Sequence, residues 1–189
     1  SAPGLYPITV SGATSNNYEI TFEDGVLTVQ AKQNQTISFA AIAVKTYGNA
    51  DFLAAATSTN TTIPVTYTSS NTSVATINTD GLVHIAGAGT TTITASQAGN
   101  DGYFPATSVS HTLTVNKVNL TVRVLDTSKV EGTPNPMFTI TYTGFVLGET
   151  AANLATAPVA TTTAGNSSTP GNYTVTPEGG VSQNYNFIS

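Results

Sequence analysis

Apolar and polar residues alternate along most of this chain, and this two-residue period is what most restricts its fold. In YEITFEDGVLTV, residues 18–29, every second residue up to Phe22 is apolar. Asp24-Gly25 then favours a tight turn into a second apolar run. We therefore predict a hairpin closed at this turn, in which the two flanking strands pair.

Similar patterns recur further along the chain, and signals for helices are nearly absent. A second Asp-Gly pair, Asp80-Gly81, separates SVATIN from LVHIAG and predicts another hairpin. The Ala-rich run from Ala50 to Ser58 is expected to be strand or loop. Two further strands are predicted to place Val109, His111, Leu113 and Val115 on one face, and Phe138, Ile140 and Tyr142 on one face. Short strands separated by turns predict an all-β fold of tandem immunoglobulin-like β-sandwich domains.

Internal repeats divide the chain. VLTVQAKQNQTISF, from Val26, is similar to TLTVNKVNLTVRV, from Thr112, at a spacing of about 86 residues. KTYGNADF, from Lys45, matches KVEGTPNPMF, from Lys129, in its Lys, its Gly and its closing Phe. We predict a partial unit at 1–29, an immunoglobulin-like domain at 30–117 and a further β domain at 118–189. The linkers between them are only a few residues long, which predicts a stiff string of domains.

One motif occurs at both ends. Residues 4–20 align without a gap on residues 171–187, but FEDGVLTV follows only the first copy. We therefore expect 1–29 to be the closing strands of one unit, and 118–189 to be a unit that lacks its last strand. The apolar faces of residues 4–29 are expected to be covered, either by a neighbouring sandwich of the same chain or by strand pairing with another molecule.

Composition excludes several classes of function. The formal net charge is −5 with only five Lys and Arg residues, so no nucleic-acid partner is expected. No apolar run is long enough to cross a membrane, and membrane insertion is not expected. The chain has no cysteine, which excludes disulfides, thiolate nucleophiles and zinc–thiolate sites. We expect no cofactor.

The segment from Val65 to Ser96 resembles the bacterial immunoglobulin-like group 2 module. The residues that carry the resemblance are Ser69-Ser70-Asn71, Val74 to Ile77, Gly81, Gly87-Ala88-Gly89 and Thr91 to Ala95. From Asn119 onward the chain is similar to the MBG family of the YGX type. Its habitual K-x-Y-G-x-x-x-P-x-F is matched by Lys129, Gly132, Pro136 and Phe138, with Glu131 in place of the Tyr. Both resemblances imply tandem repeats of large bacterial surface proteins.

The candidate site residues all have a structural interpretation as well. His84 alternates with apolar neighbours and is expected to face solvent, whereas His111 is expected to be partly buried at a strand edge. The dispersed carboxylates contain no calcium loop, although a calcium site between domains stays open. Lys45 and Lys129 are the candidates for an isopeptide crosslink to Asn, or else are exposed lysines. Tyr103 and Phe104 could stack on a sugar or simply pack over the end of a sandwich.

These features predict a non-enzymatic structural spacer or stalk module of a large bacterial cell-surface or secreted adhesin-like protein. The expected partners are neighbouring repeats of the same polypeptide, with possible strand pairing between molecules through residues 4–29. The alternative is a recognition module that binds carbohydrate or protein through its sandwich loops. The expected location is extracellular or on the bacterial cell surface. The sequence predicts no catalytic, cofactor-binding or metal-binding residue, and the ligand-binding residues are unknown.

Overall fold

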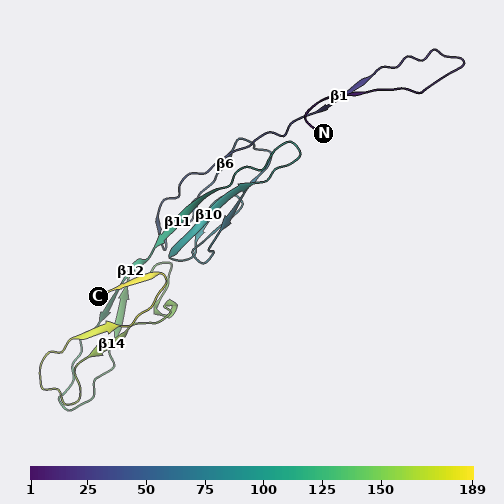
Figure 1. Ribbon diagram of the computed structural model, residues 1–189. Helices are drawn as coiled ribbons and strands as arrows, with labels where there is room; N and C mark the ends of the chain where they lie inside the picture. The colour runs from purple at the N-terminus through teal and green to yellow at the C-terminus, as the bar shows by residue number, and fades with distance from the viewer.

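The computed structural model describes all 189 residues and consists of β-strands and loops, with one 3-10 helix, η1 (Ala151–Asn153). The molecule is long and narrow, with a projecting hairpin at one end and a group of short sheets at the other (Figure 1). We refer to residues 30–117 as the middle unit and to residues 118–189 as the C-terminal unit. The all-β architecture confirms the predicted fold class.

The middle unit is a β-sandwich. Its strands are β3 (Ile37–Ser38), β4 (Lys45–Thr46), β5 (Phe52–Leu53), β6 (Thr57–Ser58), β7 (Val65–Ser69), β8 (Ala75–Ile77), β9 (Leu82–Ile85), β10 (Gly89–Gln97) and β11 (Val109–Asn116). The larger sheet has the order β4-β11-β10-β7, the smaller sheet β5-β9-β8, and β3 pairs with β6. Alternate residues point inward, which buries Ile93, Ala95, Leu113 and Val115 and gives β11 the inward face predicted from its sequence.

Two local predictions for the middle unit are confirmed. β8 and β9 pair with Ile77 opposite Val83, and the chain turns between them at Asp80-Gly81. Gly81 has a φ of +82°, and a Cβ there would lie 2.8 Å from the Cα of Ala55, so both conformation and space require glycine. The Ala-rich run contains the short strands β5 and β6 rather than a helix.

The C-terminal unit contains β12 (Val118–Val124), β13 (Ile140–Thr143), β14 (Val159–Thr162), β15 (Val175–Glu178) and β16 (Tyr185–Ile188). One sheet has the order β13-β12-β16, with β16 parallel to β12, and the other is the pair β14-β15. Leu120 and Val122 of β12 are buried between these layers. β12 is the central strand of its sheet. It follows β11 after a single residue, so the chain passes from one unit into the next between these two strands.

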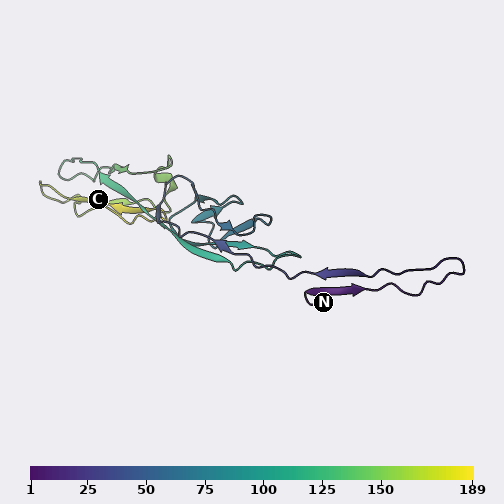
Figure 2. The same cartoon turned by 90° about the horizontal axis from the view of Figure 1, so that it is seen from above.

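The N-terminal segment forms a hairpin of its own. β1 (Gly4–Ile8) and β2 (Gly25–Val29) pair antiparallel over all five residues, and residues 9–24 extend beyond them as a long loop (Figure 2). The predicted turn at Asp24-Gly25 is therefore wrong: residues 18–22 form no strand, and β2 pairs with β1 instead. The local turn signal is overridden by this longer-range ladder, which the turn residues do not encode.

The expected covering of residues 4–29 by the middle unit is also wrong. The hairpin projects away from the rest of the chain in both views (Figures 1 and 2), and all of β1 is exposed. Leu5 is 72% exposed, Tyr18 79% and Val26 63%. Strand pairing between molecules through residues 4–29 stays a prediction.

Candidate functional site at the junction of the two units

A single residue, Lys117, separates β11 of the middle unit from β12 of the C-terminal unit. Backbone hydrogen bonds fix the chain on both sides of it. The amide of Tyr47 donates to the carbonyl of Asn116 at 2.9 Å, and the amide of Val118 donates to the carbonyl of Asn184 at 2.9 Å. Lys117 itself donates from Nζ to the carbonyl of Ser182 at 2.7 Å. A linker held in this way leaves little freedom for a hinge.

The middle unit contributes a tight turn, Thr46–Asn49, which we name the junction turn. The amide of Asn49 donates to the carbonyl of Thr46 at 3.0 Å, and Asn49 Oδ1 accepts from the amide of Thr46 at 2.9 Å. Gly48 has a φ of +86°, and a Cβ there would lie 2.8 Å from Cγ2 of Val146. The turn thus places Tyr47 and the backbone of Gly48 against the C-terminal unit, a close approach that only glycine permits.

The C-terminal unit contributes residues 182–185, which we name the docking loop. Ser182 Oγ accepts hydrogen bonds from the amides of Asn184 and Tyr185, at 3.1 and 3.2 Å, which fixes the loop before β16 begins. Asn184 Oδ1 in turn accepts from the amide of Ala88 at 2.9 Å, and Gln183 Nε2 donates to the Ala88 carbonyl at 3.3 Å. The docking loop therefore provides hydrogen-bond partners for both the amide and the carbonyl of Ala88, which would otherwise lie unpaired at the interface.

A carboxylate and two tyrosines lie at the centre of the junction. Tyr47 donates from its hydroxyl to Glu149 Oε1 at 2.9 Å, and Tyr185 donates to Glu149 Oε2. The Tyr47 and Tyr185 rings meet edge to face with centroids 6.0 Å apart, and Phe145 packs edge to face on Tyr185 at 5.2 Å. Tyr47 is 6% exposed and Tyr185 3%, whereas Glu149 is half-buried, so these hydrogen bonds to a charged acceptor are partly shielded from water.

Burial and the Glu149 carboxylate act together on the acidity of the two tyrosines. Desolvation, followed by the hydrogen bond to Glu149, raises the pKa of Tyr185 to about 12. The same two causes, in the same order, raise the pKa of the Tyr47 hydroxyl above its ordinary value. Both hydroxyls are therefore protonated donors at neutral pH, as the junction requires.

The apolar core continues through this junction. One cluster of buried residues contains Ile93 and Leu113 of the middle unit together with Leu120, Leu154 and Tyr185 of the C-terminal unit. Two units that share a core cannot rotate independently without exposing apolar surface to water. Chemically, this arrangement can hold the two units in position, because two neutral phenols donate hydrogen bonds to one carboxylate. It contains no activated nucleophile.

The sequence missed most of these residues. KTYG and the repeated Asn-Tyr pair were visible as motifs, but nothing nearby in sequence identifies Glu149, which lies 102 residues from Tyr47. The histidines do not meet in one cleft. His84 is exposed on β9, 2.8 Å from Asp51, whereas His111 is half-buried on β11 and hydrogen-bonds from Nε2 to the carbonyl of Phe39.

The other candidate residues have structural contacts. Lys45 places its Nζ 4.4 Å above the ring of Phe52, and Lys129 donates to two backbone carbonyls. Neither lysine is paired with the carboxylate that an isopeptide crosslink requires. Tyr103 is half-buried and forms a β-bridge with Gln33, whereas Phe104 is 50% exposed. No group of three or more His, Asp or Glu side chains is placed to hold a metal ion.

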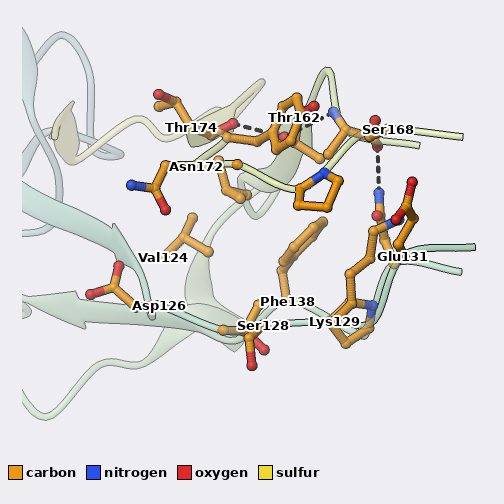
Figure 3. A pocket seen from close by; sticks show the side chains of 18 of the residues that line it. Val124, Asp126, Ser128, Lys129, Glu131, Phe138, Thr162, Ser168, Asn172 and Thr174 are labelled. Carbon is orange, nitrogen blue, oxygen red and sulfur yellow. Dashed lines mark hydrogen bonds between the residues drawn. The ribbon is translucent and has the colours of Figure 1, made fainter. Parts of the chain in front are cut away.

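A cavity of about 610 Å³ in the C-terminal unit is lined by residues from Val124 onward, and therefore lies at the other end of β12 from the junction. Figure 3 shows this cavity from close by. It separates the loop after β12 from the loop between β14 and β15. The two loops are tied together by Lys129 Nζ, which donates to the Gly165 carbonyl at 2.7 Å, and by Asn135 Nδ2, which donates to the Ala164 carbonyl at 2.7 Å. Glu131, Phe138 and Tyr173 are among the lining residues, so the wall offers both charge and aromatic surface.

Two family models match different parts of the chain. The family model of the MBG domain (YGX type) matches residues 1–28 and 120–189, and that of the intimin immunoglobulin-like domain matches residues 57–99. The second match confirms that the middle unit contains a segment similar to an immunoglobulin-like domain, at residues 57–99. No curated protein matches the chain.

Both families indicate a module of a bacterial surface protein. No helix of the structure has the length and apolar character needed to cross a membrane. The MBG match reaches both ends of the chain and covers more than half of its 189 residues. The chain therefore belongs to the MBG domain (YGX type) family, with an intimin-like immunoglobulin unit between its two MBG segments.

Proposed function

We propose that the chain is a structural spacer, a rigid stalk segment of a large bacterial cell-surface or secreted adhesin-like protein. The observation that carries this proposal is the junction of Tyr47, Glu149 and Tyr185 within a shared apolar core. A spacer has to keep its two ends at a constant separation, and a one-residue linker between interlocked units does this. A recognition module needs no such junction.

The division of labour within the chain follows from this proposal. The two domains, residues 30–117 and 118–189, keep a fixed relative orientation because the junction joins them. Residues 1–29 belong to an MBG-like segment. Neighbouring repeats of the same polypeptide are the principal partners. The mechanism is mechanical, because a bend between the two units is resisted by the hydrogen bonds and apolar contacts that join them.

Small-angle X-ray scattering of the intact chain tests the spacer. The expected profile is that of one elongated particle, unchanged when calcium is added, since no three His, Asp or Glu side chains are placed together to hold a metal ion. Glu149→Ala is the matched perturbation, with the exposed Glu178→Ala as control. A profile that requires a broad range of angles between the two units in the unmodified chain would overturn the proposal.

A further inference from the structure

Each half of the junction has a second, uncovered copy in the same chain. The junction turn, Thr46–Asn49, corresponds in sequence to Val130–Thr133 within the KVEG motif. The docking loop, 182–185, corresponds to residues 15–18 within the motif shared by the two ends. The structure shows that both correspondences extend to local geometry.

The second turn has the fold of the first. The amide of Thr133 donates to the carbonyl of Val130 at 3.2 Å, as that of Asn49 does to Thr46 at 3.0 Å. Gly132 has a φ of +79°, close to the +86° of Gly48. The surroundings differ: a Cβ on Gly48 would meet Val146 at 2.8 Å, whereas a Cβ on Gly132 would meet no atom within 4 Å. The second turn thus has the conformation of a junction turn, and no atom covers its glycine as Val146 covers Gly48.

The second docking loop is likewise already formed. Ser15 Oγ accepts from the amides of Asn17 and Tyr18, at 3.2 and 3.1 Å, which reproduces the hydrogen bonds of Ser182 to Asn184 and Tyr185. Tyr18 is 79% exposed, whereas Tyr185 is 3% exposed. A loop that holds its bound conformation before binding avoids much of the entropic cost of ordering.

The side chains of the two uncovered copies are chemically complementary. In the junction, the tyrosine of the docking loop donates to a carboxylate that comes from elsewhere in its own unit, Glu149. In the second turn a carboxylate, Glu131, occupies the position of Tyr47 itself. Glu131 is exposed at the wall of the cavity, and Phe138 lines the same cavity. A phenol that enters there would find both an anionic acceptor and an aromatic neighbour.

We propose that the 15–18 loop of one molecule docks on the Val130–Thr133 turn of a second molecule, with the Tyr18 hydroxyl donating to Glu131. The two surfaces lie at opposite ends of the long molecule (Figure 1), so one molecule cannot join them within itself. The contact is heterologous, and head-to-tail contacts of this kind extend into chains rather than closing as a twofold dimer. A loop and a turn bury little surface, which places the contact in the weak, transient class.

Sedimentation velocity of the intact chain over a wide range of concentrations tests this proposal. The expected result is association that grows with concentration into dimers and longer species. Tyr18→Phe should weaken it about tenfold, because a hydrogen bond to a charged acceptor is lost. Tyr6→Phe is the matched control, since Tyr6 lies on the same hairpin and donates only to the carbonyl of Ala2, and association should be unchanged.

A mixing experiment tests the head-to-tail geometry. Tyr18→Ser blocks one end and Glu131→Lys blocks the other; both residues are exposed, so each variant should fold and each alone should remain monomeric. An equimolar mixture retains one intact pair of surfaces and should give dimers but nothing longer. A chain that stays monomeric at every concentration would overturn the proposal. So would association that survives both substitutions, which would favour strand pairing through β1 and β2 instead.

Discussion

The junction turn and its uncovered counterpart provide a matched pair of glycines. Gly48→Ala and Gly132→Ala both place a Cβ on a residue of positive φ, +86° and +79°, which costs about 1–2 kcal/mol in each case. Only at Gly48 does the new atom meet the other unit. It would lie 2.8 Å from Cγ2 and 2.9 Å from Cβ of Val146, and a rotamer change cannot move the second of these atoms.

Relief of that overlap requires the two units to move apart or the turn to distort, at a further cost of about 1–3 kcal/mol. We therefore expect Gly48→Ala to lower the free energy of unfolding by about 1–3 kcal/mol more than Gly132→Ala does. Urea denaturation followed by circular dichroism measures both, because the chain has no tryptophan to serve as a fluorescent probe. Equal losses in the two variants would refute the close packing of the junction turn.

The remaining predictions concern the carboxylate, pH, the hairpin and ligands. Glu149→Ala should destabilise the chain by about 1–3 kcal/mol in urea denaturation, because two buried hydroxyls lose their acceptor, while exposed Glu178→Ala should have little effect. Because the pKa values of Tyr47 and Tyr185 are raised on folding, their stabilising contribution is complete below pH 10.0. The contribution of Tyr185 is lost as the pH rises toward about 12, and that of Tyr47 is lost above the ordinary pKa of a tyrosine; a tyrosinate absorbance titration should show two late-ionising phenols, and simultaneous ionisation of all tyrosines would contradict this. Backbone amides of β1 and β2 should exchange with deuterium far faster than those of β10 and β11, since a lone hairpin is marginally stable in water; equal protection would show that the hairpin is covered in solution. A glycan array should give no hits, because Tyr103 is half-buried and only Phe104 of this pair is largely exposed; hits abolished by Phe104→Ala would favour the recognition alternative.

Local patterns in the sequence were sufficient for the fold class and for several strands. Alternation placed Leu113 and Val115 on the buried face of β11, and Asp80-Gly81 marked a real hairpin, because both features depend on neighbours within a few residues. The same kind of reasoning failed at Asp24-Gly25. There β2 is paired with a strand that precedes it by about twenty residues, and turn chemistry carries no information about such a partner.

The junction could be anticipated only in part. Short linkers predicted stiffness, and the repeated motif KTYGNADF contains the residues of the junction turn, although nothing in it pointed to a contact between units. The residues that make the junction stiff could not be predicted from the sequence. Glu149 lies 102 residues from Tyr47 and 36 residues from Tyr185. No periodicity links a single Glu in a loop to two tyrosines on other segments, so this carboxylate is visible only in three dimensions.

The most direct test of the spacer is the distribution of distances between the two units. The chain has no cysteine, so Thr68→Cys and Thr176→Cys, both at exposed positions, give a specific pair of spin-label sites on β7 and β15. Double electron–electron resonance between them should yield one narrow peak, which broadens in Glu149→Ala as the junction loosens. A broad distribution in the otherwise unmodified chain would show that the two units move independently, and would contradict a rigid junction.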